Sequence, residues 1–186
     1  MTLIQRIKNR MDHSSWEEFT NWYSPYVNAI LYRSGVPFDS VEDLCQEIML
    51  RVWKSIENFE YDPSKCRFRT WLSTVCRNHL IRWFDVQKKK HNNVDMDEKY
   101  LPPGEAEIND IIENEWQVYI AAKAFEKVSE NFNEKSLKAY TDFQKGIDVA
   151  VIAEEIGVAE NTVYVYSKRV KEAMTREILM LVNELD

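Results

Sequence analysis

Apolar residues recur three and four positions apart along most of the chain, which is the spacing of one face of an α-helix. Residues 14–34 show the first such stripe. Ser15 and Glu18 form a capping-box pattern at its start, Pro25 allows a break or kink inside it, and Gly35 follows its end. The stripe consists of Phe19, Trp22, Tyr23, Tyr26, Val27, Ile30 and Leu31. We therefore predict a first amphipathic helix here.

A second helix is predicted from Asp39 or Ser40, where Asp39 and Glu42 offer another capping box. Its apolar stripe consists of Val41, Leu44, Cys45, Ile48, Val52, Ile56 and Phe59. The opposite face carries Asp43, Gln46, Glu47, Leu50 and Trp53. Single exposed apolar residues are normal on a solvated face, but tryptophan beside polar groups is also typical of protein interfaces. Both interpretations are open from this helix alone.

Arginine and aromatic residues alternate in the next helical segment, residues 66–84, after a loop at 60–65. Phe68, Trp71, Leu72, Val75 and Leu80 supply a core stripe. The remaining charged positions include Arg67, Arg69, Arg77 and Arg82. Arginine next to aromatic rings suits phosphate contact and base stacking. The alternative is a core helix with solvated arginines.

Charge divides the chain into sectors. The net charge is −7 overall, yet residues 51–90 carry 10 Lys and Arg against 4 Asp and Glu. Residues 91–115 carry 1 basic and 8 acidic residues together with Pro102-Pro103-Gly104. This composition predicts an acidic linker. Because DNA would repel it, we expect the linker to stay off the duplex or to occupy another positively charged surface.

Helical spacing resumes at Trp116 and leads to a helix-turn-helix pattern at 148–170. Asp148 is placed to cap a short helix, Gly157 to adopt the left-handed turn conformation, and a second helix is predicted from Ala159 or Glu160. Two ordinary packed helices are the alternative. The outward face of the second helix would carry Asn161, Thr162, Tyr164, Val165, Lys168 and Arg169. Such side chains suit base edges and phosphates.

Composition and the absence of certain motifs narrow the class of protein further. Hydrophobic residues make up 45% of the chain, while 4 Gly and 5 Pro are few for a sheet protein. The 3 Cys lack ligand spacing, and the 3 His are scattered. No phosphate-binding glycine loop, nucleophile–base pattern, secretory signal or membrane-length apolar run is present. We expect an all-α, non-enzymatic cytoplasmic protein with no cofactor and no metal.

In order and spacing, these segments resemble the extracytoplasmic-function (ECF) group of bacterial RNA polymerase sigma factors. The segments that carry the resemblance are Trp16-Glu17-Glu18-Phe19 with Tyr23, Asp43-Leu44-Cys45-Gln46-Glu47 with Val52-Trp53, Phe59, Phe68-Arg69-Thr70-Trp71-Leu72, Arg77-Asn78, and Thr162-Val163 with Arg169-Val170. The resemblance implies two small helical domains, 1–90 and 116–186, joined by the acidic linker 91–115. The second domain would contain the helix-turn-helix.

The resemblance also implies roles. The first domain would dock on the clamp helices of the largest subunit of core RNA polymerase through Asp43, Gln46, Glu47, Leu50 and Trp53. The −10 promoter element would be recognised and melted by Arg67, Phe68, Arg69, Trp71, Arg77, Asn78 and Arg82, with one base flipped into the Cys66–Trp71 loop. The linker would thread toward the polymerase active-site channel.

The second domain would read the −35 element through Asn161, Thr162, Tyr164, Val165, Lys168 and Arg169. An anti-sigma factor is a further possible partner. Two departures from the family pattern stand out: Ile81-Arg82-Trp83 replaces an acidic residue followed by Arg, and the recognition helix carries only Lys168, Arg169 and Lys171 as bases. The alternative function is a helix-turn-helix regulator that acts without polymerase, which would leave residues 43–53 and 68–78 unexplained.

Overall fold

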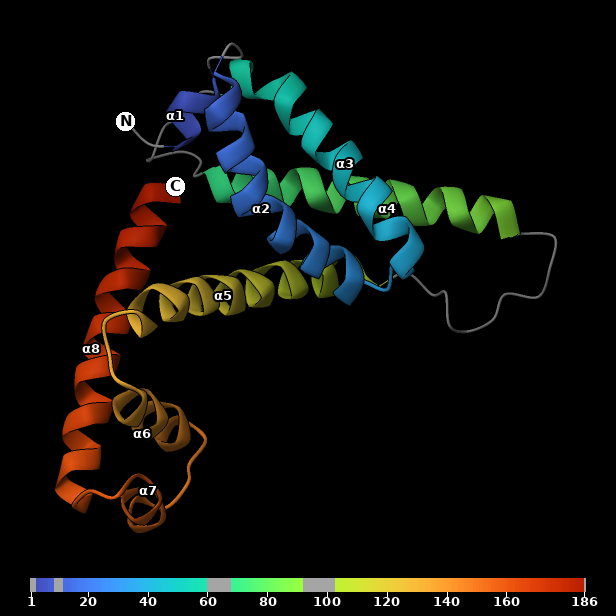
Figure 1. Ribbon diagram of the computed structural model, residues 1–186. Coiled ribbons are helices and arrows are strands. Elements are labelled where there is room, and N and C mark those ends of the chain that lie inside the picture. Colours follow the sequence, from blue (N-terminus) through green and yellow to red (C-terminus); the bar gives the residue numbers. More distant parts are fainter. Residues whose placement is uncertain (1–2, 9–11, 60–67, 92–102, 186) are drawn as a thin grey trace. The chain divides into compact units, whose positions relative to one another are not determined.

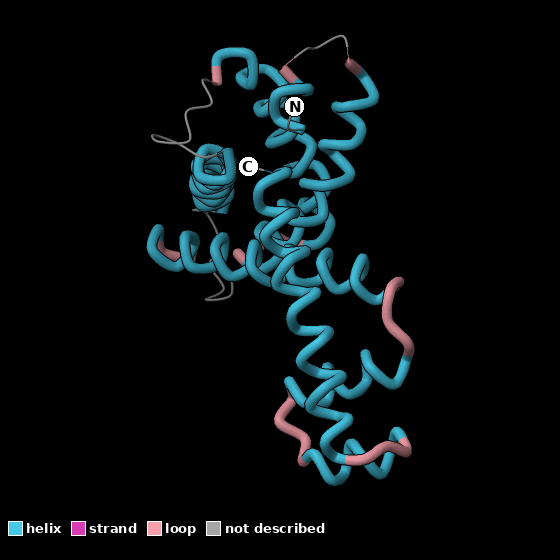
Figure 2. Tube along the Cα trace, turned by 90° about the vertical axis from the view of Figure 1, so that its left-hand side faces the viewer, coloured by secondary structure: helices cyan, strands magenta, loops and turns pink. Residues whose placement is uncertain are grey.

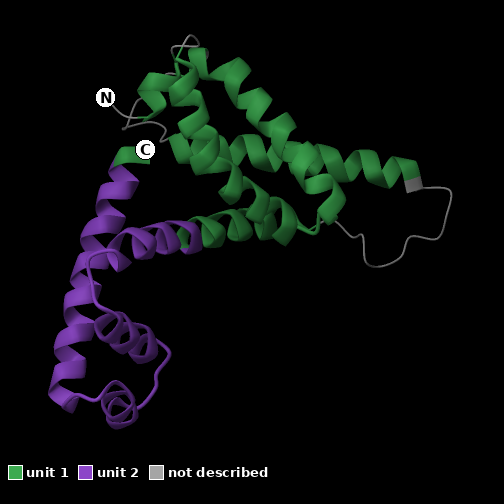
Figure 3. Ribbon diagram, viewed as in Figure 1, with its two compact units in different colours: residues 1–117, 184–186 green, residues 118–183 purple. Residues whose placement is uncertain are grey.

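A computed structural model describes residues 3–8, 12–59, 68–91 and 103–185. These residues form α-helices, one short 3₁₀ helix and connecting loops, and none of them lies in a strand (Figure 2). The all-α prediction is therefore confirmed. The chain divides into two compact units (Figure 3). Unit 1 is residues 1–117 with 184–186, and unit 2 is residues 118–183.

Unit 1 is built on helices α1 (Leu3–Ile7), α2 (His13–Arg33), α3 (Phe38–Ser55) and α4 (Phe68–His91), with the 3₁₀ helix η1 (Ile56–Asn58) after α3. Helices α1 and α3 both pack against α2, and α4 packs against α3 (Figure 1). The predicted stripes form the core, because Phe19, Tyr26, Ile30, Ile48 and Val52 have no exposed surface. Each such side chain contributes roughly 1.5–3 kcal/mol through burial.

The caps of the first two long helices differ from the predicted ones. Helix α2 begins before Ser15, and its N-cap is Asp12, whose carboxylate accepts from the Ser15 amide at 3.0 Å. Ser15 is buried and donates its hydroxyl to the same carboxylate at 2.6 Å. Helix α3 follows Pro37 without a side-chain cap. Pro25 lies inside a continuous α2, so it does not end the helix.

Helix α4 buries one residue per turn along its length: Phe68, Leu72, Cys76, Leu80 and Phe84. Trp71 and Val75, also predicted for the core stripe, are half-buried. Phe68 lies at the centre of an aromatic cluster, with ring centroids 5.7 Å from Phe19, 5.5 Å from Tyr23 and 5.8 Å from Phe59. This cluster joins α2, α4 and the segment after η1 into one core.

Helix α5 (Glu105–Ser129) starts eleven residues earlier than the linker prediction allows, since that prediction ends the linker at residue 115. Its buried stripe runs at four-residue intervals through Ile108, Ile112, Trp116, Ile120, Ala124 and Val128. The prediction placed the start of this stripe at Trp116. Residues 105–117 belong to unit 1 and 118–129 to unit 2. The part of the predicted linker from 105 to 115 is therefore helical and belongs to the first unit.

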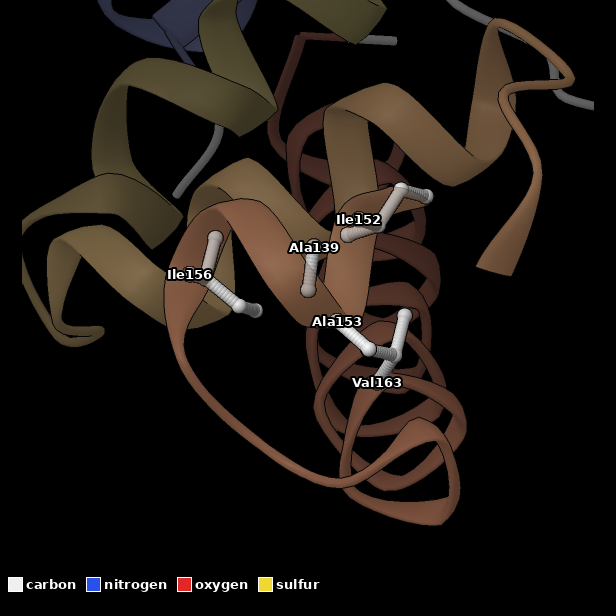
Figure 4. Packing of buried hydrophobic residues seen from close by; sticks show 5 residues of the cluster. All are labelled: Ala139, Ile152, Ala153, Ile156 and Val163. Atoms are coloured by element: carbon white, nitrogen blue, oxygen red, sulfur yellow. The ribbon is translucent and has the colours of Figure 1, made fainter. Parts of the chain in front are cut away.

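Unit 2 contains the remainder of α5 with α6 (Glu134–Gln144), α7 (Val149–Ile156) and most of α8 (Glu160–Leu185). The side chains of Ala139, Ile152, Ala153, Ile156 and Val163 gather where α6, α7 and α8 meet (Figure 4). Two alanines in this cluster allow the helices to approach closely.

Local chemistry at α7 follows the predicted pattern. The Asp148 carboxylate accepts from the Ala150 amide at 2.8 Å and caps α7. Gly157 has a φ of 65°, a left-handed conformation that a side chain would strain. The next helix then begins at Glu160.

Candidate functional site

The first candidate surface is the outward face of α3. Asp43, Gln46, Glu47 and Leu50 are exposed, and Trp53 is half-buried. The opposite face of the helix lies in the core, so packing against α2 and α4 fixes which side chains point outward. Asp43, Gln46, Glu47 and Leu50 lie three or four residues apart and therefore share one helical face, and Trp53 continues it.

Two residues extend this surface beyond the sequence prediction. An open hollow of about 340 Å³ is lined by Leu50 and Trp53 together with Trp16 of α2 and Met49 of α3. The ring of Trp16 stacks on Phe19 at 5.0 Å, which holds it at the rim of the core. In the sequence, Trp16 belongs to a segment that carries the family resemblance, but nothing there placed it beside the α3 face. The hollow adds an apolar part to an otherwise acidic face.

The second candidate surface lies on α4. Asn78 and Arg82 are exposed, and Trp71 is half-buried against Phe59 at 5.1 Å and Phe68 at 5.4 Å. Arg67 and the preceding loop lie outside the described residues. Phe68 was predicted both for the core stripe and for the −10 surface, and its place in the core is confirmed, because it is 0% exposed and its ring is surrounded by other aromatic side chains. A ring buried in this way offers no face for stacking on a base, and its contacts join α4 to the rest of the core.

Arg69 and Arg77 of α4 do not face open solvent in unit 1. Arg69 Nη1 donates to Glu113 Oε2 at 2.6 Å, and its guanidinium lies 5.5 Å from the ring centroid of Trp116. Arg77 Nη1 donates to Asn109 Oδ1 at 3.2 Å. All three partners belong to the first part of α5. Two arginines of the predicted surface, Arg69 and Arg77, are thus partly covered by a segment that the sequence assigned to the linker.

His79 lies where the α3 and α4 surfaces meet. Partial burial lowers its pKa, the positive charges of Arg51 and Arg82 lower it further, and the Glu47 carboxylate opposes this shift. Glu47 belongs to the predicted docking face and Arg82 to the predicted nucleic-acid face. The two candidate surfaces therefore adjoin one another across α3 and α4.

The third candidate surface is the outward face of α8. Asn161, Tyr164, Val165, Lys168 and Arg169 are exposed, and Thr162 is partly exposed. Val163 and Val170 face the core with no exposed surface, which fixes the rotation of the helix. The ring of Tyr164 meets that of Phe143 of α6 edge-on at 5.8 Å. The residues predicted to contact DNA thus share one solvent face.

An ion-pair network supports this unit from α6. The Asp142 carboxylate is 2.7 Å from Lys138 Nζ and 2.9 Å from Lys145 Nζ, and Lys138 also contacts Glu155 of α7 at 2.8 Å. Hydrogen bonds from the two lysines lower the pKa of Asp142. The contact between Lys138 and Glu155 links α6 to α7 and holds the short helix in place.

No group of three His, Cys, Asp or Glu side chains lies close enough to hold a metal ion among the residues described. In the same residues, no helix is long and apolar enough to cross a membrane. Cys45 and Cys76 are buried thiols.

The first part of the chain is similar to known proteins. The family model for sigma-70 region 2 matches residues 21–90, which contain α3 and α4. This part of the chain is similar to sigma-70 region 2 domains. The ECF RNA polymerase sigma factor RpoE of Cereibacter sphaeroides is 30% identical over 81 residues. That match spans 44% of this chain and 44% of the relative. The range matched by the region 2 model includes both the α3 face and the α4 arginines, whereas α7 and α8 lie beyond it.

Proposed function

We propose that this chain is a sigma factor of the ECF group, which binds core RNA polymerase and directs it to promoters. The observation that carries the proposal is the outward face of α3. Within a part of the chain that is similar to sigma-70 region 2, it presents Asp43, Gln46, Glu47 and Leu50 to solvent. Trp53 and the neighbouring hollow supply the large apolar contact that interfaces favour.

In this proposal the clamp helices of the polymerase's largest subunit cover the α3 face. Acidic and amide groups give such an interface its orientation and partner choice, while the apolar hollow gives most of the affinity. The α4 surface then recognises and melts the −10 element. Asn78 and Arg82 are exposed there for contacts with bases and phosphates, and Trp71 offers a partly exposed ring for stacking, worth about 1–3 kcal/mol per base.

The −35 element is assigned to the solvent face of α8. Asn161 and Thr162 lie at the first turn of the helix, where the recognition helix of a helix-turn-helix meets base edges. Lys168 and Arg169 add positive charge two turns later. Few basic residues face outward, so the second domain should bind DNA weakly alone. The polymerase would supply most of the remaining affinity.

Transcription in vitro tests the proposal. Core polymerase and the full-length protein are incubated with a library of bacterial genomic DNA fragments, and the 5′ ends of the transcripts are sequenced. The proposal predicts transcripts that depend on the protein and share upstream elements near −35 and −10. A regulator that works without polymerase docking, the alternative function, would bind DNA fragments but would start no transcripts with core enzyme. Absence of both dependent transcripts and core binding would refute the sigma-factor function.

A further inference from the structure

Two arginines of the proposed −10 surface are covered by the chain itself. The side chains of Arg69 and Arg77 are only 24% and 27% exposed. Their carboxylate partners, Glu113 and Glu105, are 51% and 68% exposed. The arginines therefore lie beneath the acidic face of α5, while the carboxylates stay closer to solvent.

The covering segment is residues 105–117, which we name the acidic segment. Its other side is anchored in unit 1. Ile108, Ile112 and Trp116 are buried, the Tyr26 hydroxyl donates to the Ile112 carbonyl at 3.2 Å, and the Tyr26 and Trp116 rings meet edge-on at 5.3 Å. The buried apolar residues hold the acidic segment in unit 1, so that Glu105 and Glu113 lie next to the arginines of α4.

The contacts on Arg77 are incomplete. Its Nη1 has an acceptor in Asn109, but its Nε is buried without a hydrogen-bond acceptor among the described residues. The nearest carboxylate oxygen, Glu105 Oε1, is 3.7 Å away, which is too long for a hydrogen bond. A phosphate with several oxygens would satisfy a guanidinium more fully than this pair does. The acidic segment is thus a replaceable ligand for this arginine.

We propose that the acidic segment competes with promoter DNA for Arg69 and Arg77, so that it must leave α4 before the −10 strand can bind. The proposal rests on the proposed function and adds a regulatory step to it. Glu105 and Glu113 take positions that DNA phosphates would otherwise occupy. Docking on polymerase uses the α3 face and does not involve these pairs, so the two activities can be measured separately.

Binding of single-stranded DNA tests the competition. The probe is a fluorescein-labelled 20-nucleotide strand of random sequence, titrated with full-length protein at low salt and followed by anisotropy. The test variant carries Glu105→Gln and Glu113→Gln. The control carries Glu107→Gln and Asp110→Asn, which remove the same charge from exposed positions of the same helix. The proposal predicts at least fivefold tighter binding by the test variant than by the control.

Addition of Arg69→Gln and Arg77→Gln to the test variant should remove this gain. Equal affinities of the test and control variants would overturn the competition, even if both proteins bind core polymerase and support transcription. Loss of polymerase binding in every variant would instead refute the proposed function.

Hydrogen exchange gives a second reading that does not depend on DNA affinity. Amides of residues 105–117 should exchange faster in the test variant than in the control, because the pairs that hold the segment on α4 are gone. The DNA strand should increase exchange of the same amides in the wild-type protein. Unchanged exchange in both experiments would mean that the segment stays in place, and would overturn the proposal.

Discussion

Substitution of Phe68 separates a structural role from a DNA-contacting one. The side chain is fully buried, and its ring lies between 5.4 and 5.8 Å from the rings of Phe19, Tyr23, Phe59 and Trp71. Phe68→Ala removes these contacts and leaves a cavity, which costs about 3–5 kcal/mol. The free energy of unfolding of a native protein is about 5–15 kcal/mol, so loss of this one ring would remove a large share of it.

The matched substitution Phe68→Leu keeps an apolar side chain in the cluster and loses the aromatic contacts. Aromatic pairs add about 0.5–1.5 kcal/mol beyond burial, so its cost should be smaller than that of alanine. Thr70→Ala, at an exposed position two residues later, should change stability by less than about 0.5 kcal/mol. Urea unfolding followed by circular dichroism gives the free energy of unfolding of the three variants.

DNA binding completes the comparison. If Phe68 is structural, the folded Phe68→Leu protein should bind the single strand as tightly as the wild type does. If the Phe68→Ala protein unfolds at the same urea midpoint as the wild type, the structural role of Phe68 is refuted. Normal stability with lost DNA binding would place the ring on the DNA, as the sequence pattern first suggested.

Three further predictions concern other parts of the molecule. Gly157→Ala should destabilise unit 2 by about 1–2 kcal/mol, because the left-handed backbone does not suit a side chain; Gly157→Asn should cost less, and equal urea midpoints for both would contradict the strain. In a Cys66→Ser background, Cys45 and Cys76 should react with a thiol reagent at pH 8 only as fast as the protein unfolds. The reason is that burial raises the pKa of Cys45 to about 11 and that of Cys76 to about 12. Rapid labelling of the native protein would contradict this prediction. Arg169→Ala should weaken promoter binding by about 1–3 kcal/mol if the arginine reads a base. The same loss of binding free energy on every −35 sequence would identify a phosphate contact instead.

Local patterns were sufficient where the physical cause is local. Asp148 caps α7 through an amide two residues away, and Gly157 adopts the left-handed conformation that ends the helix. Both were predictable because each depends on its immediate neighbours. The buried stripe of α3 followed from helical spacing in the same way. The positions of α3 outside this stripe were then expected on its outward face.

Features that depend on partners distant in sequence could not be predicted. The sequence predicted Phe68 both for the core stripe and for a nucleic-acid surface, and the positions of Phe19, Tyr23 and Phe59 around its ring decide for the core. The acidic composition of residues 91–115 predicted a linker that stays off the duplex or occupies another positively charged surface, without indicating which surface. The pairs of Glu113 with Arg69 and Glu105 with Arg77 bring together residues more than 25 positions apart, and composition cannot specify such contacts.

Affinity for core RNA polymerase is the most direct measure of the central claim. Full-length protein carrying Gln46→Ala and Trp53→Ala is compared with the wild type and with Leu179→Ala, which alters an exposed apolar residue of unit 2. Circular dichroism confirms that each protein is folded. The account predicts that the double substitution weakens binding at least tenfold, as expected for an interface centred on a tryptophan, while Leu179→Ala binds like the wild type. Equal affinity of all three proteins, or no binding by the wild type, would contradict it.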